Sequence, residues 1–178
     1  MTPVVLLDQV VHTSYGQFTL EWGDSGDAWD GNADRFFADQ QNGWIGAAVE
    51  GTVVVVLARY GGGSAMRIEL WPEEPPTDAS WEDCVEVSTT VGPGDVVGWG
   101  TWDWTESGKL ALSPGSYRLR ANARGRDAGH AGEFDPEVVD FYLLQFWPAP
   151  PTVDAVVRTT SIDAAGWNDG WGSRRSSS

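Results

Sequence analysis

Hydrophobic and polar residues alternate along most of this chain, which is the pattern of half-buried β-strands. Residues 13–22 show it most clearly, with Phe18, Leu20 and Trp22 on one face. Residues 52–59 are instead a continuous, largely β-branched run, which predicts a central strand buried on both faces. Further strand candidates span residues 4–11, 44–49, 66–71, 84–90, 95–104, 109–112, 116–123 and 138–147.

Turn residues separate these strand candidates. Glu50 and Gly51 predict a two-residue hairpin, and the proline-rich residues 72–78 predict an exposed acidic loop. One short helix is expected at residues 33–41, with Asp30 or Asn32 as its N-cap.

The number and spacing of the strands set the expected fold class. About seven to nine short strands with one short helix predict an all-β fold, an antiparallel β-sandwich. We expect this domain to occupy residues 1–150. Prolines at residues 148–151 then break the pattern. Residues 151–178 are therefore expected to be a C-terminal extension that is largely irregular, although residues 153–158 should lie against the domain.

The charges are segregated along the chain. From Glu21 to Glu106 there are 17 Asp or Glu and three Arg, whereas residues 107–126 carry five cations and no acid. The formal net charge is −15, so part of the folded surface should be strongly negative. Such a field attracts a cationic partner and repels nucleic acid and anionic membranes, so direct binding of either is not expected.

No disulfide and no membrane segment is expected. Cys84 is the single cysteine, and its position in a strand candidate predicts a small buried side chain. No run approaches the roughly 20 apolar residues that span a bilayer. The first residues also lack the positive segment of a secretory signal. A cytoplasmic protein is expected.

The Gly- and Asp-rich segment before the helix resembles a calcium loop only in part. Asp30, Asn32 and Asp34 meet the one-three-five ligand spacing of an EF-hand, but Arg35 stands at the glycine position and Gln41 at the glutamate position. The EF-hand interpretation therefore fails. A solvated loop with a helix N-cap is expected, another kind of cation site stays open, and no cofactor is expected.

Catalytic motifs are absent from the sequence. His12 and His130 are too few for a typical histidine-based metal site, and no nucleophile motif accompanies them. Carboxylate pairs such as Asp103 and Glu106 keep a hydrolase open as an alternative, because glycosidases use two carboxylates across a cleft. In so acidic a chain such pairs usually face water, and a non-enzymatic protein is expected.

Tryptophan is abundant, with 11 in the chain, and residues 99–104 hold three of them. In an extended strand Trp102 and Trp104 share one face. Because aromatic faces stack on sugar rings, a β-sandwich carbohydrate-binding module using Trp29, Trp99 or Trp102 is an alternative function. Core packing is the competing interpretation and is preferred for Trp147.

The basic segment predicts a strand with Arg118, Arg120 and Arg124 on one face. Nucleic-acid binding would need a basic surface, and the charge of the whole protein opposes it. We expect these arginines to face acids on a neighbouring strand and to keep a sheet edge soluble.

Two segments carry a family resemblance. The first is Ser14-Tyr15-Gly16-Gln17-Phe18-Thr19-Leu20, and the second is Leu110-Ala111-Leu112-Ser113-Pro114-Gly115-Ser116-Tyr117-Arg118-Leu119. In order and spacing they resemble the Ser-Tyr-x-Gln-Phe segment and the Leu-x-x-Gly-x-Tyr-x-Leu turn and strand of the competence protein J family. The resemblance covers residues 11–147. It implies a β-rich, non-enzymatic inhibitor of a DNA-entry nuclease, and it assigns no contact residues.

Charge and resemblance together predict an acidic protein that binds and neutralises a basic enzyme, with a nuclease as the leading candidate. A nuclease groove is cationic because it holds phosphates, and carboxylates can take their place. Carboxylates from separate loops are expected to form one anionic patch. A structural or assembly protein, acidic only for solubility, is a further alternative. The expected partner-binding residues are Asp24, Asp27, Trp29, Asp30, Asp34, Glu73, Glu74, Trp81, Glu82, Asp83, Trp99, Trp102 and Asp103.

Overall fold

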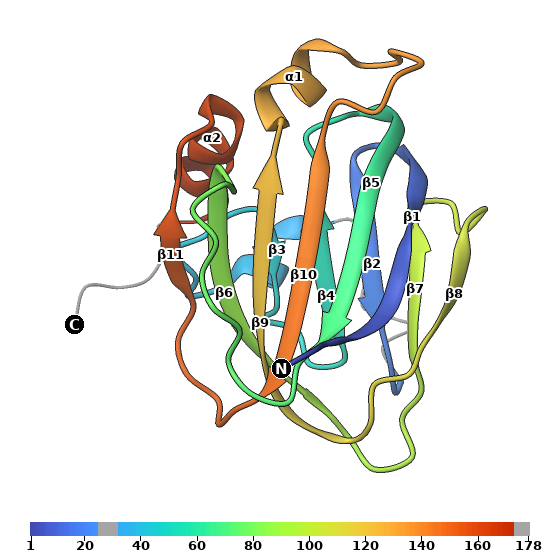
Figure 1. The fold of residues 1–178 in the computed structure, drawn as a ribbon, viewed down its shortest axis with the longest axis vertical. Coiled ribbons are helices and arrows are strands. Elements are labelled where there is room, and N and C mark those ends of the chain that lie inside the picture. The colour runs from blue at the N-terminus through green and yellow to red at the C-terminus, as the bar shows by residue number, and fades with distance from the viewer. Residues whose placement is uncertain (25–31, 173–178) are drawn as a thin grey trace.

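The computed structural model describes residues 1–24 and 32–172, and Figure 1 shows two β-sheets, one in front of the other. The front sheet has six strands in the order β1-β5-β10-β9-β6-β11, and the second has five in the order β3-β4-β2-β7-β8. The strands are β1 (Val4–Ser14), β2 (Gln17–Glu21), β3 (Ile45–Gly46), β4 (Thr52–Val56), β5 (Gly61–Leu70), β6 (Asp83–Val91), β7 (Val97–Thr101), β8 (Ser107–Leu110), β9 (Gly115–Arg124), β10 (Phe141–Pro148) and β11 (Ala155–Arg158).

The core lies between the two sheets, and the period-two pattern of the sequence builds it. Phe18 and Leu20 of β2 point inward and are fully buried. Leu119 and Ala121 of β9 belong to the same apolar cluster from the other sheet. Strands such as β2 and β9 therefore give alternate residues to one shared core, and their remaining residues face outward.

The all-β, sandwich-like prediction agrees with this architecture, but two details differ. The described residues form more strands than the seven to nine expected, and the strand without a sequence candidate is β11, which lies in the C-terminal segment. In addition, β10 pairs with β5 in parallel, while the other pairs between described strands are antiparallel.

The expected short helix exists as a single 3-10 turn, η2 (Ala33–Phe37). Its N-cap is Asn32, whose side chain accepts a hydrogen bond from the backbone N–H of Asp34, as one of the two predicted caps requires. Two α-helices were not expected from the sequence: α1 (Arg126–Ala131) and α2 (Ile162–Gly170). Among the described residues, no helix is long and apolar enough to cross a membrane.

The C-terminal segment differs most from expectation, because it is built into the fold through buried polar contacts. The carboxylate of Asp83 accepts hydrogen bonds from Thr160 N, Ser161 N and Ser161 Oγ at 2.6–3.0 Å. Arg126 and Asp163 form an ion pair at 2.7 Å that joins α1 to α2. These contacts hold α2 against the domain, so the described part of the extension is ordered structure, with β11 paired to β6.

Gly43 shows how closely α2 approaches the body of the protein. A Cβ at this position would lie 1.8 Å from the carbonyl oxygen of Trp167. No other residue fits there without displacing the helix. Asn168 completes the contact, because its side chain accepts a hydrogen bond from the N–H of Gly43 at 2.9 Å.

The outer surface of the six-stranded sheet, which we call the ion-pair face, carries the charged side chains of β5, β6 and β9. Arg120 pairs with Glu86 at 2.8 Å and with Glu74 at 2.9 Å, and Arg118 pairs with Glu86 at 3.2 Å. Arg118 and Arg120 are buried, although they point away from the core. The prediction that arginines of β9 face acids on a neighbouring strand is confirmed, because Glu86 belongs to β6. The expected placement of this strand at a sheet edge is wrong, because β9 lies between β10 and β6.

Candidate functional site

The outer surface of the five-stranded sheet, which we call the open face, contains two adjoining cavities. Its floor is made by the outward residues of β2 and β4. The first cavity has a volume of about 420 Å³ and the second about 320 Å³. Both are lined by Gln17, Phe36 and Val54, so together they form one groove along the sheet.

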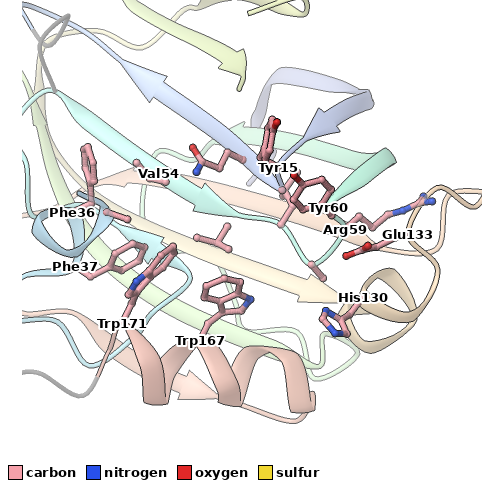
Figure 2. Close-up of a pocket in the computed structure, with 16 residues that line it drawn as sticks. Tyr15, Phe36, Phe37, Val54, Arg59, Tyr60, His130, Glu133, Trp167 and Trp171 are labelled. Carbon is pink, nitrogen blue, oxygen red and sulfur yellow. The ribbon is translucent and has the colours of Figure 1, made fainter. Parts of the chain in front are cut away.

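Aromatic side chains from four parts of the chain surround the first cavity (Figure 2). Trp167 and Trp171 reach it from α2 and from the residue that follows this helix, with ring centroids 4.7 Å apart. Trp171 stacks on Phe37 of η2 at 5.0 Å. The sheet side chain Val54 faces this cluster. The helix that the sequence did not predict therefore supplies a wall of the groove.

The other end of the first cavity is bounded by Tyr15, Tyr60 and Arg59. Tyr15 packs edge-on against Tyr60 at 5.0 Å and against Trp102 at 5.6 Å. Arg59 is fully buried, and its two Nη atoms donate to the carbonyl oxygens of Gly63, Gly132, Asp135 and Glu137 at 2.6–2.9 Å. This guanidinium holds the chain between α1 and β10 in place.

A carboxylate and two tryptophans characterise the second cavity. Glu21 of β2 lines it together with Trp102 and Trp104. Burial raises the pKa of the Glu21 carboxyl above its ordinary value, because the charged form loses contact with water. Gly100 lets Trp104 lie against β7, since a Cβ there would be 2.1 Å from the Trp104 ring. The cavity thus combines aromatic surface with a carboxylate that forms no ion pair with a described cation.

The expected acidic residues around the helix are placed only in part. Asp24 and Asp34 are exposed. Asp24 lines a shallow cavity that also contains Glu50 and Asp95. Asp27, Trp29 and Asp30 lie outside the described residues, so this half of the predicted acidic loop stays a prediction.

The second expected segment lies on the ion-pair face. Glu73, Glu74 and Glu82 are exposed, and Glu74 pairs with Arg120. Trp81 is partly buried because its ring lies beneath Arg124 of β9, with the guanidinium carbon 5.2 Å from the ring centroid. This segment covers the six-stranded sheet and partly neutralises its arginines.

Two of the expected site residues are buried, and their exposure was predicted wrongly. Asp83 begins β6 and is the acceptor that anchors the C-terminal segment, so its carboxylate has no exposed surface. Trp99 is 6% exposed and stacks on Phe18 of the core at 5.7 Å. Its inward direction follows from the register that pairs it with Leu20.

Trp102 and Asp103 remain at the surface, but not on a strand. β7 ends at Thr101, and residues 102–106 form a turn in which Trp104 has a positive φ of 57°. Asp103 accepts hydrogen bonds from the N–H and hydroxyl of Thr105, which lowers the pKa of its carboxyl. The expectation that Trp102 and Trp104 share a strand face is wrong, yet both side chains line the second cavity.

Among the described residues, the expected site residues therefore do not gather into one patch. The segment that carries Glu73 to Trp81 lies on the ion-pair face, as its contacts with Arg120 and Arg124 show. Trp102 lines the open face, and Figure 1 places the turn between β7 and β8 far from the segment that precedes β6. Within the described residues, no group of three or more His, Cys, Asp or Glu is arranged to hold a metal ion.

Sequence reasoning missed Glu21, Thr52, Trp104, Trp167 and Trp171 as lining residues. The signal for Glu21 was present, because a strand that buries Phe18 and Leu20 must turn Thr19 and Glu21 outward. The tryptophans of α2 had no such signal, since only the polar anchors of the C-terminal segment bring them to the sheet.

The chain shares its fold with known structures, but no sequence family matches it. No family model matches the chain, and no curated protein matches it. The fold is similar to the crystal structure of ComJ, the inhibitor of the DNA degrading activity of NucA, from Bacillus subtilis. The TM-score is 0.57 at 20% identity, over 84% of this chain and 100% of that chain.

A second similar structure is that of crocagin biosynthetic gene J. Its TM-score is 0.50 at 16% identity, again over 84% of this chain and 100% of that chain. At these identities the two likenesses show the fold alone, and fold does not by itself determine function.

Proposed function

We propose that this protein is a non-enzymatic inhibitor that binds a cationic enzyme, and that the enzyme is a nuclease. The observation that carries the proposal is the shared fold with ComJ, which spans the whole of that inhibitor. The resemblance of the Ser14–Leu20 segment to the competence protein J family points the same way. Both rest on different properties of the chain, one on backbone geometry and one on residue order.

The charge of the protein suits this role. A nuclease must hold phosphates, so the surface around its active site is cationic. The net charge of −15 would speed encounter with such a surface through long-range attraction. Among the expected residues, Asp24, Glu73 and Glu82 keep exposed carboxylates. The groove of the open face adds aromatic area, which supplies residence time at protein interfaces.

The direct test is inhibition of DNA degradation. A nuclease encoded beside the gene for this chain is purified, and its digestion of plasmid DNA is followed with increasing amounts of the inhibitor. NucA serves as a second enzyme. We expect digestion to stop near equimolar amounts for the neighbouring nuclease. Undiminished digestion by both enzymes at large excess would overturn the proposal.

Binding measured by calorimetry separates electrostatic from other contributions. From about 0.1 M to about 1 M salt the screening length falls from ~10 Å to ~3 Å. We expect the affinity to weaken steeply over this range. An affinity that is independent of salt would contradict the electrostatic part of the proposal.

A carbohydrate-binding module is the second candidate, because Trp102 and Trp104 line one cavity at the surface. Titration of tryptophan fluorescence against soluble polysaccharides distinguishes the two. A saturable change that Trp102→Ala abolishes would favour sugar binding. The inhibitor proposal expects no change with any polysaccharide.

A further inference from the structure

The second cavity of the open face contains a negative charge without a counter-charge. Glu21 forms no ion pair with any described cation, and no lysine or arginine lines this cavity. The nearest lysine in the sheet register, Lys109, lies on β8, two strands away across Gly98. It lines a neighbouring cavity together with Glu21 and Trp104, but it forms no ion pair with Glu21 within 4.0 Å. Burial also raises the pKa of the Glu21 carboxyl, because its charge is partly desolvated.

A second and independent feature is an unpartnered hydroxyl in the floor of the same cavity. Thr52 lies directly opposite Glu21 in the β2–β4 register and is 1% exposed. Its Oγ1 has no hydrogen-bond partner among the described residues. A buried hydroxyl without a partner is destabilising, so a ligand that donates a hydrogen bond there would gain from its presence.

The walls of the cavity are aromatic. Trp102 and Trp104 are 36% and 45% exposed, and Phe36 of η2 lines the cavity as well. Indole faces attract cations, and they attract a guanidinium most effectively when its plane can stack on the ring. The carboxylate of Glu21, the hydroxyl of Thr52 and the aromatic walls are therefore all suited to bind a guanidinium group.

We infer that this cavity receives a single arginine side chain presented by the cationic partner protein. Glu21 would pair with the guanidinium, Thr52 Oγ1 and Gln17 would accept further N–H donors, and Trp102 or Trp104 would stack on its plane. The volume of about 320 Å³ lies at the low end of ligand pockets, which range over roughly 300–1,000 Å³, and suits one side chain. Lysine fits less well, because its ammonium is compact and does not stack.

This inference rests on the proposed function for the identity of the partner, but not for the chemistry of the site. The site can therefore be tested without a nuclease. The probe is N-acetyl-arginine methylamide, and the neutral control is N-acetyl-citrulline methylamide, which has the same shape without the charge. Binding is followed by NMR through the indole N–H signals of the full-length protein, assigned with Trp102→Phe and Trp104→Phe.

We expect the arginine compound to shift the indole signals of Trp102 and Trp104, with a dissociation constant of about 1 mM, as befits one side chain. Glu21→Gln should weaken this binding at least about tenfold, the loss typical of a charge-assisted hydrogen bond. Glu50→Gln removes the same charge at an exposed position outside this cavity and should leave binding unchanged.

Three outcomes would overturn the inference: no shift of either indole signal, equal shifts from the citrulline compound, or equal binding by wild type and Glu21→Gln. The two proposals fail separately. If the Glu21→Gln variant still inhibits the nuclease as well as wild type does, the arginine site is contradicted and the inhibitor proposal stands. If the protein binds the arginine compound but inhibits no nuclease, the inhibitor proposal is contradicted and the arginine site stands.

Discussion

The two outer faces of this molecule differ in whether their buried polar side chains have partners. On the ion-pair face, Arg118 and Arg120 are buried, and each is paired with a carboxylate within 3.2 Å. On the open face, Glu21 has no ion pair within the described residues, and the hydroxyl of Thr52 has no partner there. One face is closed by its own chain, while the other keeps a groove of two cavities.

This difference separates polar groups that stabilise the fold from polar groups that are available to a ligand. Buried charges that are fully paired stabilise a particular arrangement of the chain, and removing one partner is costly. A desolvated charge without a partner opposes folding, and such a group in a cavity is a candidate for contact with an external ligand. The ion-pair face is therefore assigned to folding and the open face to binding.

The largest effect is expected from breaking the ion-pair face. Arg120→Ala leaves Glu86 and Glu74 without their counter-charge and should lower the free energy of unfolding by about 3–5 kcal/mol. Glu21→Gln on the open face should change it by no more than about 0.5 kcal/mol. Urea unfolding followed by circular dichroism measures both. Similar losses for the two variants would remove the distinction between the faces.

The next effect concerns the wall that α2 gives to the open face. Asp83→Ala removes the acceptor for three hydrogen bonds and should lower the free energy of unfolding by about 2–3 kcal/mol. Hydrogen exchange should accelerate throughout α2, because its anchor is lost. Glu82→Ala, its exposed neighbour, is the control and should leave exchange unchanged. Equal exchange in both variants would show that Asp83 does not hold the helix.

A smaller effect is the pH dependence of Glu21. Its carboxyl has a raised pKa in the folded protein, so ionising it opposes folding. Below the ordinary value of 4.5 the group is protonated in both states and has no influence. As the pH rises through the raised pKa, wild type should lose stability relative to Glu21→Gln. Thermal unfolding at several pH values checks this, and a constant difference would contradict it.

The smallest effect is expected at Cys84 on the ion-pair face. Burial raises the pKa of its thiol to about 11, so at pH 8 roughly one thousandth is thiolate. A thiol reagent should therefore not modify the native protein, and should react fully after unfolding in urea. Fast modification of the native protein would mean that this face opens more readily than its contacts indicate.

The local sequence pattern was sufficient to predict most strands and the N-cap Asn32. Alternation identified β2, because Phe18 and Leu20 repeat with the period of a strand. The basic segment was correctly expected to face acids, since opposite charges on neighbouring strands pair. Cys84 was correctly expected to be buried in a strand.

What sequence pattern could not supply is the set of contacts between distant segments. α2 is weakly amphipathic and is held by Asp83 and Asp163, which meet partners far away in the chain. Trp99 and Trp102 are three residues apart, yet one is core and one is surface, because β7 ends between them at Thr101. The acidic loops were expected to meet, but residues 73–81 lie against the six-stranded sheet and Trp102 lies on the five-stranded sheet.

Hydrogen-exchange mass spectrometry of this protein, alone and bound to the proposed nuclease partner, tests the central claim most directly. Amide exchange reports which backbone segments a partner protects. We predict slower exchange on binding in β2, β4 and residues 101–106, with no change in β6, β9 and β10. Protection confined to β6, β9 and β10, with β2 and β4 unchanged, would contradict the assignment of the open face to binding.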